Sequence, residues 1–442
     1  MNRRKFLVRS AAAGASLTGL IPSISLAGDK VLKSDRIVVA TVGLRGRGHA
    51  LTKIFANADD VDLRYMCDVD ENILKERTAE IVETTRHRPE ALGDFRRALD
   101  DPSVDAIAIA TPDHWHAIPT ILACQAGKDA YTEKPDGHNI LEGKTMVAMA
   151  KKHKRIVQLG THVRSSHNML DAMAYIRAGN LGRTLFAKAW ESQRQGNLGN
   201  PPDSKPPQGV DYDFWLGPAP KRPFNHLRFH GNWRWFLDYG TGDLGNDGVH
   251  RMDYALWGLR TAVEAQGEKL PRFPKVVSSH GGKNYFDDAQ EWPDTLMTTY
   301  DFGGYLLTYE MRLWSPYPLH GLGEGAIILG DKGSVLLGNR GWSAYDEEGK
   351  EILTREGPSN LQASFVHVRN FLDCMRTRKR PAADLETVGH PSSLLCHVGN
   401  VAWRVGRSVK FDAKTETFLG DPEANQFVGR PEYRKPWVLP KI

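Results

Sequence analysis

Arg36-Ile-Val-Val-Ala-Thr-Val-Gly-Leu-Arg-Gly-Arg-Gly48 is the segment from which the architecture of this chain can be predicted. Residues 36–42 form an apolar run that is typical of a parallel strand buried on both faces. The Gly-rich turn then leads into residues 49–58, whose apolar side chains recur on one helical face, and residues 61–68 alternate as a second strand. This order predicts a β-α-β unit.

The same alternation of strands and helices continues to about residue 160. Strands are predicted at 104–110, 129–132 and 156–159, and helices at 115–126 and 141–153. Strands that alternate with helices predict an α/β fold with a doubly wound parallel sheet. We therefore assign residues 36–160 to an N-terminal Rossmann domain.

A different pattern begins at about residue 161. Longer β-rich stretches appear at 295–302, 305–314 and 325–337, joined by hairpin-like turns, and they predict one large antiparallel sheet. Two amphipathic helices, at 361–376 and 393–407, are expected to cover one face of the fold. We assign residues 161–442 to a C-terminal α/β domain for substrate binding and oligomerisation, because an open sheet favours a homo-oligomer.

Composition excludes several classes of function. Of the 442 residues, 40% are hydrophobic and 25% are charged, which suffices for two domains with separate cores. The net charge of +5 is small and the basic residues are dispersed, so no nucleic acid is expected as a partner. The cysteines lie far apart without CxxC spacing, and we predict buried thiols at Cys67, Cys124, Cys374 and Cys396.

The first 27 residues have the pattern of an export signal. Paired Arg3 and Arg4 precede a weakly hydrophobic stretch rich in Ala and Gly that ends at Ser25-Leu-Ala27. That order is typical of a twin-arginine signal peptide, so we expect residues 1–27 to be removed, residues 28–35 to act as a linker and the protein to be periplasmic or otherwise exported. The alternatives are a membrane anchor or a basic tail, but the apolar part is too short to span a bilayer stably.

The Gly-rich turn has the position that a dinucleotide site requires. It follows an apolar strand and opens a helix, whose N-terminal amides can bind pyrophosphate. Arg45 departs from the usual GxGxxG pattern because it occupies the place of the second glycine. Asp68 ends the second strand at the offset where a carboxylate binds the adenosine ribose, which favours NAD over NADP. The predicted cofactor contacts here are Gly43, Arg45, Gly46, Gly48 and Asp68; a tight structural turn and a surface acid are the alternative.

Three later segments resemble the signature motifs of the Gfo/Idh/MocA oxidoreductase family. They are Ala110-Thr-Pro-Asp-His-Trp-His116, Glu133-Lys-Pro135 and Gly240-Thr-Gly-Asp-Leu-Gly-Asn-Asp-Gly-Val-His-Arg-Met-Asp253, and they occur in the family's order. The resemblance covers roughly residues 36–410. It implies a Rossmann domain followed by an α/β domain with an open antiparallel sheet, and a pocket between them in which NAD meets a carbohydrate.

The resemblance also implies which residues react. Lys134 matches the lysine of the Glu-Lys-Pro motif, and His250 matches the family's acid/base histidine. An imidazole suits this role because its ordinary pKa, about 6.5, lets it accept an alcohol proton. Many members carry Asp where this chain has Asn246, so the carboxylate partner of His250 is open, and Asp247 is the neighbouring candidate.

The remaining candidates follow from the same comparison. Further cofactor contacts are predicted at Thr111, Pro112, His116, Glu133 and Gln158. Substrate contacts are predicted at Arg164, Asp253, Trp233 and Arg234, the last two within an aromatic and basic segment, 224–236, that suits a sugar. No metal site is predicted, because the sixteen histidines show neither HExxH nor a two-His-carboxylate spacing.

Three functions remain open at this point. An exported enzyme has no obvious pool of NAD, so we expect a tightly bound cofactor that is restored in each cycle. The leading hypothesis is an NAD-dependent oxidoreductase acting on a sugar, polyol or glycoside hydroxyl. The second is a glycosidase that uses bound NAD for transient oxidation, as some relatives do. The third is a non-catalytic sugar-binding relative, favoured by the unusual Arg45 and Asn246.

Overall fold

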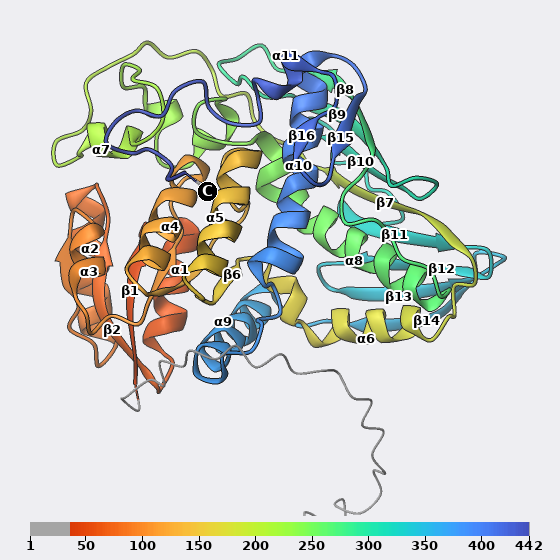
Figure 1. Ribbon diagram of the computed structural model, residues 1–442, viewed down its shortest axis with the longest axis horizontal. Helices are drawn as coiled ribbons and strands as arrows, with labels where there is room; N and C mark the ends of the chain where they lie inside the picture. Colours follow the sequence, from red (N-terminus) through yellow and green to blue (C-terminus); the bar gives the residue numbers. More distant parts are fainter. Residues whose placement is uncertain (1–35, 442) are drawn as a thin grey trace, which may run out of the picture. The chain divides into compact units, whose positions relative to one another are not determined.

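Two β-sheets organise residues 36–441, which are the residues that the computed structural model describes. Figure 1 shows the first sheet with its helices in red and orange, and the second sheet mainly in cyan and teal. The predicted signal peptide, 1–27, and linker, 28–35, lie outside the described residues. The domain boundary at 160/161 stays a prediction.

The first sheet is entirely parallel and has six strands in the order β3-β2-β1-β4-β5-β6. All six residues of the central strand β1 are buried, as expected for a strand covered on both faces. The predicted doubly wound sheet is confirmed. Its strand order reverses between β1 and β4, and ligands bind at the carboxyl ends of the strands at such a point. The strands are β1 (Ile37–Val42), β2 (Val61–Cys67), β3 (Glu90–Leu92), β4 (Ala106–Ile109), β5 (Asp129–Thr132) and β6 (Val157–Leu159).

Helices connect these strands as the sequence pattern predicts. The first helix begins at Gly46, within the Gly-rich turn and three residues earlier than expected. The helices are α1 (Gly46–Ala56), α2 (Glu71–Thr84), α3 (Arg96–Asp100), α4 (Ala117–Gln125) and α5 (Ile140–Lys152), with a 3-10 turn η2 (Asp113–Trp115) before α4.

The second sheet has ten strands in the order β14-β13-β12-β11-β7-β10-β9-β8-β15-β16. The predicted antiparallel sheet is confirmed with one exception, since β7 and β10 run parallel. A long connection with its own helices separates these two strands, and parallel strands require such a crossover. The strands are β7 (Thr184–Ser192), β8 (Val276–Gly282), β9 (Thr295–Asp301), β10 (Leu306–Arg312), β11 (Glu324–Gly330), β12 (Gly333–Gly338), β13 (Gly341–Asp346), β14 (Glu351–Glu356), β15 (Val409–Asp412) and β16 (Thr417–Phe418).

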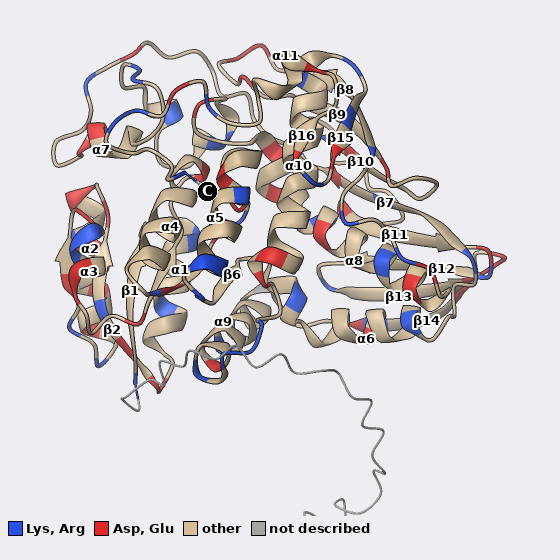
Figure 2. Ribbon diagram, in the orientation of Figure 1, with Lys and Arg blue, Asp and Glu red and all other residues tan. Residues whose placement is uncertain are grey.

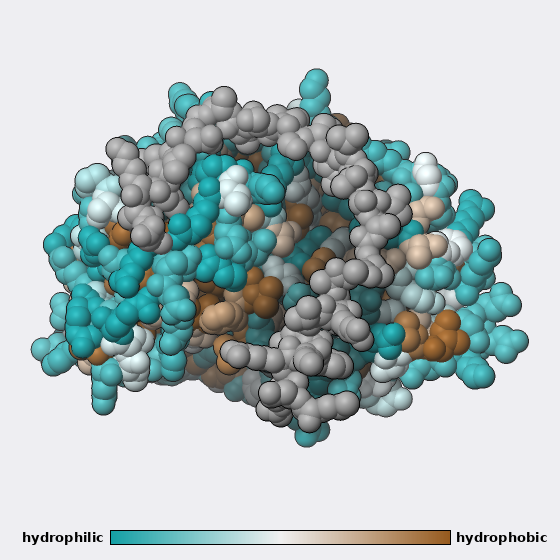
Figure 3. All heavy atoms as spheres, turned by 90° about the horizontal axis from the view of Figure 1, so that it is seen from below, coloured by the Kyte–Doolittle hydropathy of each residue, from teal (hydrophilic) through white to brown (hydrophobic). Residues whose placement is uncertain are grey.

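Helices α6 (His167–Arg177) and α8 (Val249–Ala265) cover one face of the second sheet (Figure 1). On the other face Met297, Leu306 and Leu329 alternate with core residues and remain exposed. Self-association through this face stays a prediction. The face of the molecule seen in Figure 3 is mainly hydrophilic, with smaller apolar patches.

The remaining elements are short. They are η3 (His162–Ser165), α7 (Tyr212–Leu216), η4 (His226–Arg228), η5 (Asn232–Trp235), the π-helical turns η6 (Leu244–Gly248) and η7 (Leu385–Gly389), and α11 (Pro422–Asn425). Among residues 36–441, no helix combines the length and apolar character needed to cross a bilayer. Charges of both signs are interspersed along the ribbon (Figure 2). The four cysteines are free and buried, as predicted.

The last two long helices do not cover a common face, contrary to expectation. Helix α9 (Asn360–Thr377) packs against the first sheet, where Phe371 and Leu372 contact the core that contains Ile37 and Val39. Phe365, which the periodicity places on the buried stripe, is exposed instead. Helix α10 (His390–Val405) packs in the core of the second sheet. The two amphipathic stripes therefore serve different cores, although they lie close together in the chain.

A buried charge network joins α10 to the loop that follows β5. Asp136 Oδ2 lies 2.6 Å from Nδ1 of His390, and Glu416 Oε2 lies 2.9 Å from its Nε2. His397 Nε2 lies 3.3 Å from the other oxygen of Asp136. Burial opposes the charged ring, but the carboxylates outweigh it and raise the pKa of His390 to about 9. This network holds the segment directly after Lys134 in place.

Candidate functional site

A cavity of about 810 Å³ opens at the carboxyl ends of β1, β2, β4 and β5. Its first wall consists of loops that follow these strands, and its second wall comes from segments beyond residue 160. Both predicted halves of the site therefore face one cavity. The candidate residues that line it are Gly43, Arg45, Gly46, Asp68, Thr111, Pro112, His116, Glu133, Lys134, Trp233, Arg234, Asn246, Asp247 and His250.

The Gly-rich turn brings the backbone close to the space that a pyrophosphate would occupy. Gly43 has a φ of +82°, and a Cβ at Gly48 would collide with the Gly43 carbonyl oxygen. Helix α1 begins at Gly46 with no side-chain cap and no acidic residue in its first turn, so its end favours an anion. Arg45, at the place of the usual second glycine, is exposed on the cavity wall. A guanidinium on this wall would add positive charge beside a bound pyrophosphate.

Asp68 stands at the end of β2 and is held by two backbone bonds. The Leu44 amide donates to its Oδ2 at 2.7 Å, and the Asp70 amide donates to its Oδ1 at 3.0 Å. Burial raises the pKa of Asp68, and the two amide bonds oppose that shift. The carboxylate keeps free lone pairs for ribose hydroxyls. These features fit an adenosine ribose.

The aromatic and basic segment 224–236 closes over the same cavity. Trp233 and Arg234 line it, as predicted for a sugar-binding wall. His230 adopts a positive φ of +58° and places Nε2 3.0 Å from Oδ2 of Asp70, beside the nucleotide loop. Burial and the charge of Arg45 lower the pKa of His230 to about 4. The segment therefore faces the predicted nucleotide region as well as the predicted sugar region.

Lys134 reaches from the end of β5 toward the second wall. Its Nζ donates to the main-chain oxygen of Asn246 and lies 3.4 Å from the Asn246 side-chain oxygen. Asn246 belongs to the π-helical turn η6, which leads directly into α8. The neutral Asn246 therefore orients the lysine without adding a second charge.

His250 lies in the first turn of α8 on the same wall. It is buried, and its Nδ1 has no hydrogen-bond partner among the described residues. Burial lowers the pKa of His250 well below 6.5, and the charge of Lys134 lowers it further. The ring of His162 packs edge-on against it, with ring centroids 5.2 Å apart. A neutral imidazole beside a lysine can accept a proton.

Several predicted cofactor contacts support the loops of the first wall. Arg47 donates from Nε to Glu133 Oε1 at 2.8 Å and so joins helix α1 to the Glu-Lys-Pro segment. The ring nitrogens of His116 lie 2.7 Å from the carbonyl oxygen of Pro135 and 2.8 Å from that of Thr111. His116 and Glu133 therefore hold the positions of their neighbours.

The structure does not bring Gln158, Arg164 or Asp253 to the cavity wall. Gln158 is buried and donates to the carbonyl oxygen of His367 at 2.9 Å. Arg164 donates twice to the carboxylate of Asp253, at 2.8 Å each, and its guanidinium lies over the ring of Trp257. As the structure places them, these side chains bond to one another and to neighbouring elements.

Other lining residues were not among the predicted site residues. Arg251 forms an ion pair with Glu324 of β11, and both line the cavity together with Asn339 and His162. Arg251 lies within the motif segment 240–253, whereas Glu324 carries no motif, because only the register of the second sheet brings β11 to the start of α8. Asp247 also lines the cavity, and its carboxylate accepts from Asn246 at 3.1 Å. Among the described residues, no carboxylate is hydrogen-bonded to Nδ1 of His250.

Two profiles of one oxidoreductase family match the chain. The profile of the family's NAD-binding Rossmann fold matches residues 36–161, and that of its C-terminal alpha/beta domain matches residues 183–265 and 356–439. The described fold and the family profiles therefore agree on an NAD-binding first domain.

Curated relatives share part of the sequence. A "Glycosyl hydrolase family 109 protein" of Shewanella putrefaciens is 27% identical over 212 residues, which are 42% of this chain and 44% of the relative. A protein of the same description from Shewanella baltica is 26% identical over 243 residues, or 45% of this chain and 52% of the relative. The chain thus spans about half the length of the curated relatives that it matches.

Solved structures share the fold. The aldose-aldose oxidoreductase of Caulobacter crescentus, complexed with glycerol, aligns with a TM-score of 0.62 at 20% identity, over 85% of this chain and 100% of that one. The WlbA dehydrogenase of Bordetella pertussis, in complex with NADH and UDP-GlcNAcA, aligns with a TM-score of 0.62 at 19% identity, over 85% and 99%. A shared fold is what these identities show.

The Asp68→Asn variant should bind NADH about tenfold or more weakly and lose most of its preference for NADH over NADPH. The variant loses charged hydrogen bonds to the ribose, and it also loses the charge that repels a 2′-phosphate. Fluorescence titration with both nucleotides measures this. Asp62→Asn is the matched control, because Asp62 lies on the same strand and pairs with Arg64 at 2.6 Å. Equal nucleotide affinities in wild type and Asp68→Asn would remove Asp68 from the site.

Proposed function

This chain belongs to the Gfo/Idh/MocA oxidoreductase family, and we propose that it uses NAD to oxidise a hydroxyl group of a sugar, polyol or glycoside. One observation carries the proposal. The neutral His250, with an unpartnered Nδ1, stands beside Lys134 on the wall of the cavity at the carboxyl ends of the strands. A base and a cation at this place suit the removal of a hydroxyl proton.

The residues present fit the dinucleotide. The turn at Gly43 and Gly48 has no side chain in the way, and together with the uncapped start of α1 it suits the pyrophosphate. The carboxylate of Asp68 suits the ribose. When bound, NAD supplies an acceptor for the hydride of the carbon that carries the hydroxyl. The protein then has to orient that carbon and remove the proton.

His250 and Lys134 have separate tasks in this proposal. His250 accepts the hydroxyl proton, since burial keeps its ring neutral at pH 7. Lys134, oriented by Asn246, hydrogen-bonds the hydroxyl oxygen and stabilises the negative charge that develops there. Trp233 and Arg234 provide an aromatic face and a hydrogen-bonding fork for the remainder of the sugar.

A second candidate is a glycosidase that oxidises its substrate transiently. The curated relatives named as family 109 glycosyl hydrolases favour it. A ketone acidifies the neighbouring C–H, so loss of that proton lets the glycosidic C–O bond break and the aglycone leave as an alcohol after protonation. Addition of water and reduction of the ketone complete a cleavage with no net redox change. Both candidates share the first oxidation and the same base.

A third candidate, a sugar-binding relative without catalysis, agrees less well with the cavity. The unusual residues Arg45 and Asn246 were the reason to consider this candidate, but a role in an enzyme explains the position of each. Arg45 lies where a pyrophosphate needs positive charge, and Asn246 positions Lys134. The variants below separate this candidate from the two enzymatic ones.

His250→Gln and Lys134→Met should each lower kcat for hydroxyl oxidation by about 10²–10⁴-fold, because the first removes the base and the second removes the cation that stabilises the developing negative charge. Turnover of a responsive sugar, followed at 340 nm or by keto-sugar detection, is the measurement. Lys144→Met is the control, since Lys144 of α5 does not line the cavity and donates to the carbonyl oxygen of Thr415 at the surface.

The pH profile provides an independent check on His250. A base whose pKa lies well below 6.5 stays neutral until the pH falls below that value, so the acid limb of kcat/KM should lie below pH 6.5. A limb above pH 6.5, or unaltered turnover in either variant, contradicts the assignment.

Product analysis distinguishes the two enzymatic candidates. With a panel of nitrophenyl glycosides in deuterium oxide, the oxidoreductase should give keto-glycoside with stoichiometric reduced nucleotide. The glycosidase should release nitrophenol and free sugar with deuterium at the carbon next to the oxidised one. Intact glycoside without either product, in a sample shown to bind NADH, contradicts both.

We also propose that the protein is exported with its cofactor already bound, on the basis of Arg3 and Arg4. Protein from a periplasmic extract should carry about one dinucleotide per chain in native mass spectrometry. Changing both arginines to lysine should leave it in the cytoplasm, whereas Arg9→Lys should not. Equal export of the double variant contradicts the signal, and cofactor-free periplasmic protein contradicts retention.

A further inference from the structure

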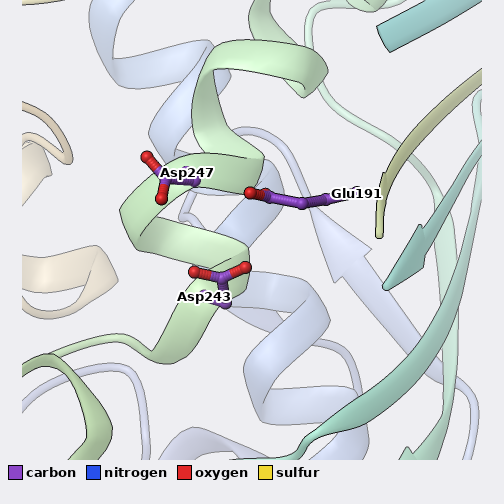
Figure 4. Close-up of side chains that lie close together, drawn as sticks. All are labelled: Glu191, Asp243 and Asp247. Atoms are coloured by element: carbon purple, nitrogen blue, oxygen red, sulfur yellow. The ribbon is translucent and has the colours of Figure 1, made fainter. Parts of the chain in front are cut away.

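Three carboxylates lie close together beside the second wall of the cavity, and one of them, Asp247, lines the cavity and belongs to the predicted site. Glu191 lies near the end of β7, and Asp243 and Asp247 lie at the start and within the π-helical turn η6. One oxygen from each residue lies within 4.8 Å of the other two. Figure 4 shows Glu191 reaching from its strand toward the helical turn that carries both aspartates. We call these three residues the acidic triad.

Two residues of the acidic triad are fully buried, and one of these two, Asp243, has no hydrogen-bond partner among the described residues. Glu191 is 0% exposed and Asp243 is 1% exposed. Neither carboxylate oxygen of Asp243 has a hydrogen-bond partner among the described residues. A buried carboxylate without a donor is costly unless a proton or a cation compensates it. Asp243 therefore points to a bound group that the protein itself does not provide.

The neighbouring cations compensate the triad only in part. Arg234 and, to a smaller extent, Arg251 act on Asp243 through space, but neither donates a hydrogen bond to it and the Arg251 guanidinium forms an ion pair with Glu324. Glu191 accepts from the side chain of Gln193 and, at 3.4 Å, from the Tyr309 hydroxyl, which are neutral donors. The pocket between these carboxylates is thus strongly favourable for positive charge.

The backbone arranges the two aspartates for a shared ligand. They are four residues apart on a helical turn, a spacing that places side chains on the same face. The turn is π-helical, a geometry that is frequent at functional sites. Gly248 lets strand β10 approach the turn closely, since a Cβ there would lie 2.6 Å from the Tyr309 hydroxyl.

We propose that Glu191, Asp243 and Asp247 bind one hard divalent cation, Mn²⁺ or Mg²⁺, in the wall of the cavity. All three donors are carboxylate oxygens, which these cations prefer over the nitrogen and sulfur ligands typical of zinc. This inference departs from the expectation of a metal-free protein, which considered histidine spacing alone. It does not require the protein to be an oxidoreductase.

The position of the triad also suggests what the cation does. Asp247 lines the cavity next to Asn246, which orients Lys134. Coordination positions that face the cavity are open to water or to a sugar hydroxyl. This second step rests on the proposed function, since it requires a carbohydrate in the cavity. A cation there orients the hydroxyls next to the reacting one.

The test uses the full chain after treatment with a chelator and dialysis. Isothermal titration with MnCl₂, together with electron paramagnetic resonance of free Mn²⁺, should show one ion bound per chain. Asp243→Asn should weaken binding by at least about 100-fold, because a direct ligand matters more than an outer-shell partner, whose loss costs 10–100-fold. Glu191→Gln should behave in the same way.

A matched control and a stability readout keep the result interpretable. Glu310→Gln changes an acid on the neighbouring strand β10 that pairs with Lys188 at 2.6 Å, and it should bind Mn²⁺ like the wild type. Mn²⁺ should raise the Tm of the wild type and of Glu310→Gln but not of Asp243→Asn. In chelator the Asp243→Asn protein should melt no lower than the wild type, since it loses a carboxylate repulsion.

Two outcomes overturn the proposal. If Mn²⁺ neither binds nor changes the Tm of the wild type, the triad is compensated by a proton shared between carboxylates. If Asp243→Asn binds Mn²⁺ as tightly as the wild type, the ion occupies another place. NADH titration of the same samples reports the nucleotide site separately, so a failed cation site leaves the proposed function intact.

Discussion

The site depends on one close approach in the backbone, that of Gly48 to the carbonyl oxygen of Gly43. No side chain fits between them, so the first turn of α1 lies directly against the end of β1 and leaves its amides at the mouth of the crevice. The second strand then ends at Asp68, whose carboxylate is held by the amide of Leu44 in the same turn. The turn at residues 43–48 therefore places both groups to which we assign nucleotide binding, the helix amides and the carboxylate of Asp68.

Buried ion pairs hold the two walls of the cavity in their relative positions. Lys134 follows β5, and His250 lies in the first turn of α8, so nothing in the local sequence brings them together. Asp136, two residues after Lys134, is bonded to His390 and His397 of α10, which packs in the core of the second sheet. A buried ion pair contributes little net stability but strongly disfavours other arrangements. Here it fixes the loop that carries the lysine.

Sequence patterns predict the first half of the molecule well, because strand, turn and helix are local there. The Gly-rich turn, Asp68, Lys134 and His250 all line the cavity or support it, as expected. Gln158, Arg164 and Asp253 do not line it. Gln158 bonds to His367 of α9, and Asp253 bonds to Arg164 and to Ser392 of α10, so their positions depend on how these helices pack. The grouping of Glu191 with Asp243 and Asp247 had no signal, because β7 and η6 are about fifty residues apart and meet only through the packing of the second sheet, although both aspartates lie in the motif segment 240–253. Assignments of function to these residues remain predictions that the variants described above address.

The position of helix α9 affects when the first domain can complete its folding during synthesis. Its residues 368–375 complete the apolar layer on Ile37 and Val39, yet the ribosome makes them more than three hundred residues later. Until they emerge, one side of the nascent nucleotide-binding half stays open to water and to chaperones. Maturation therefore has to wait for nearly the entire polypeptide, and an excised fragment ending at residue 160 lacks part of its own interior.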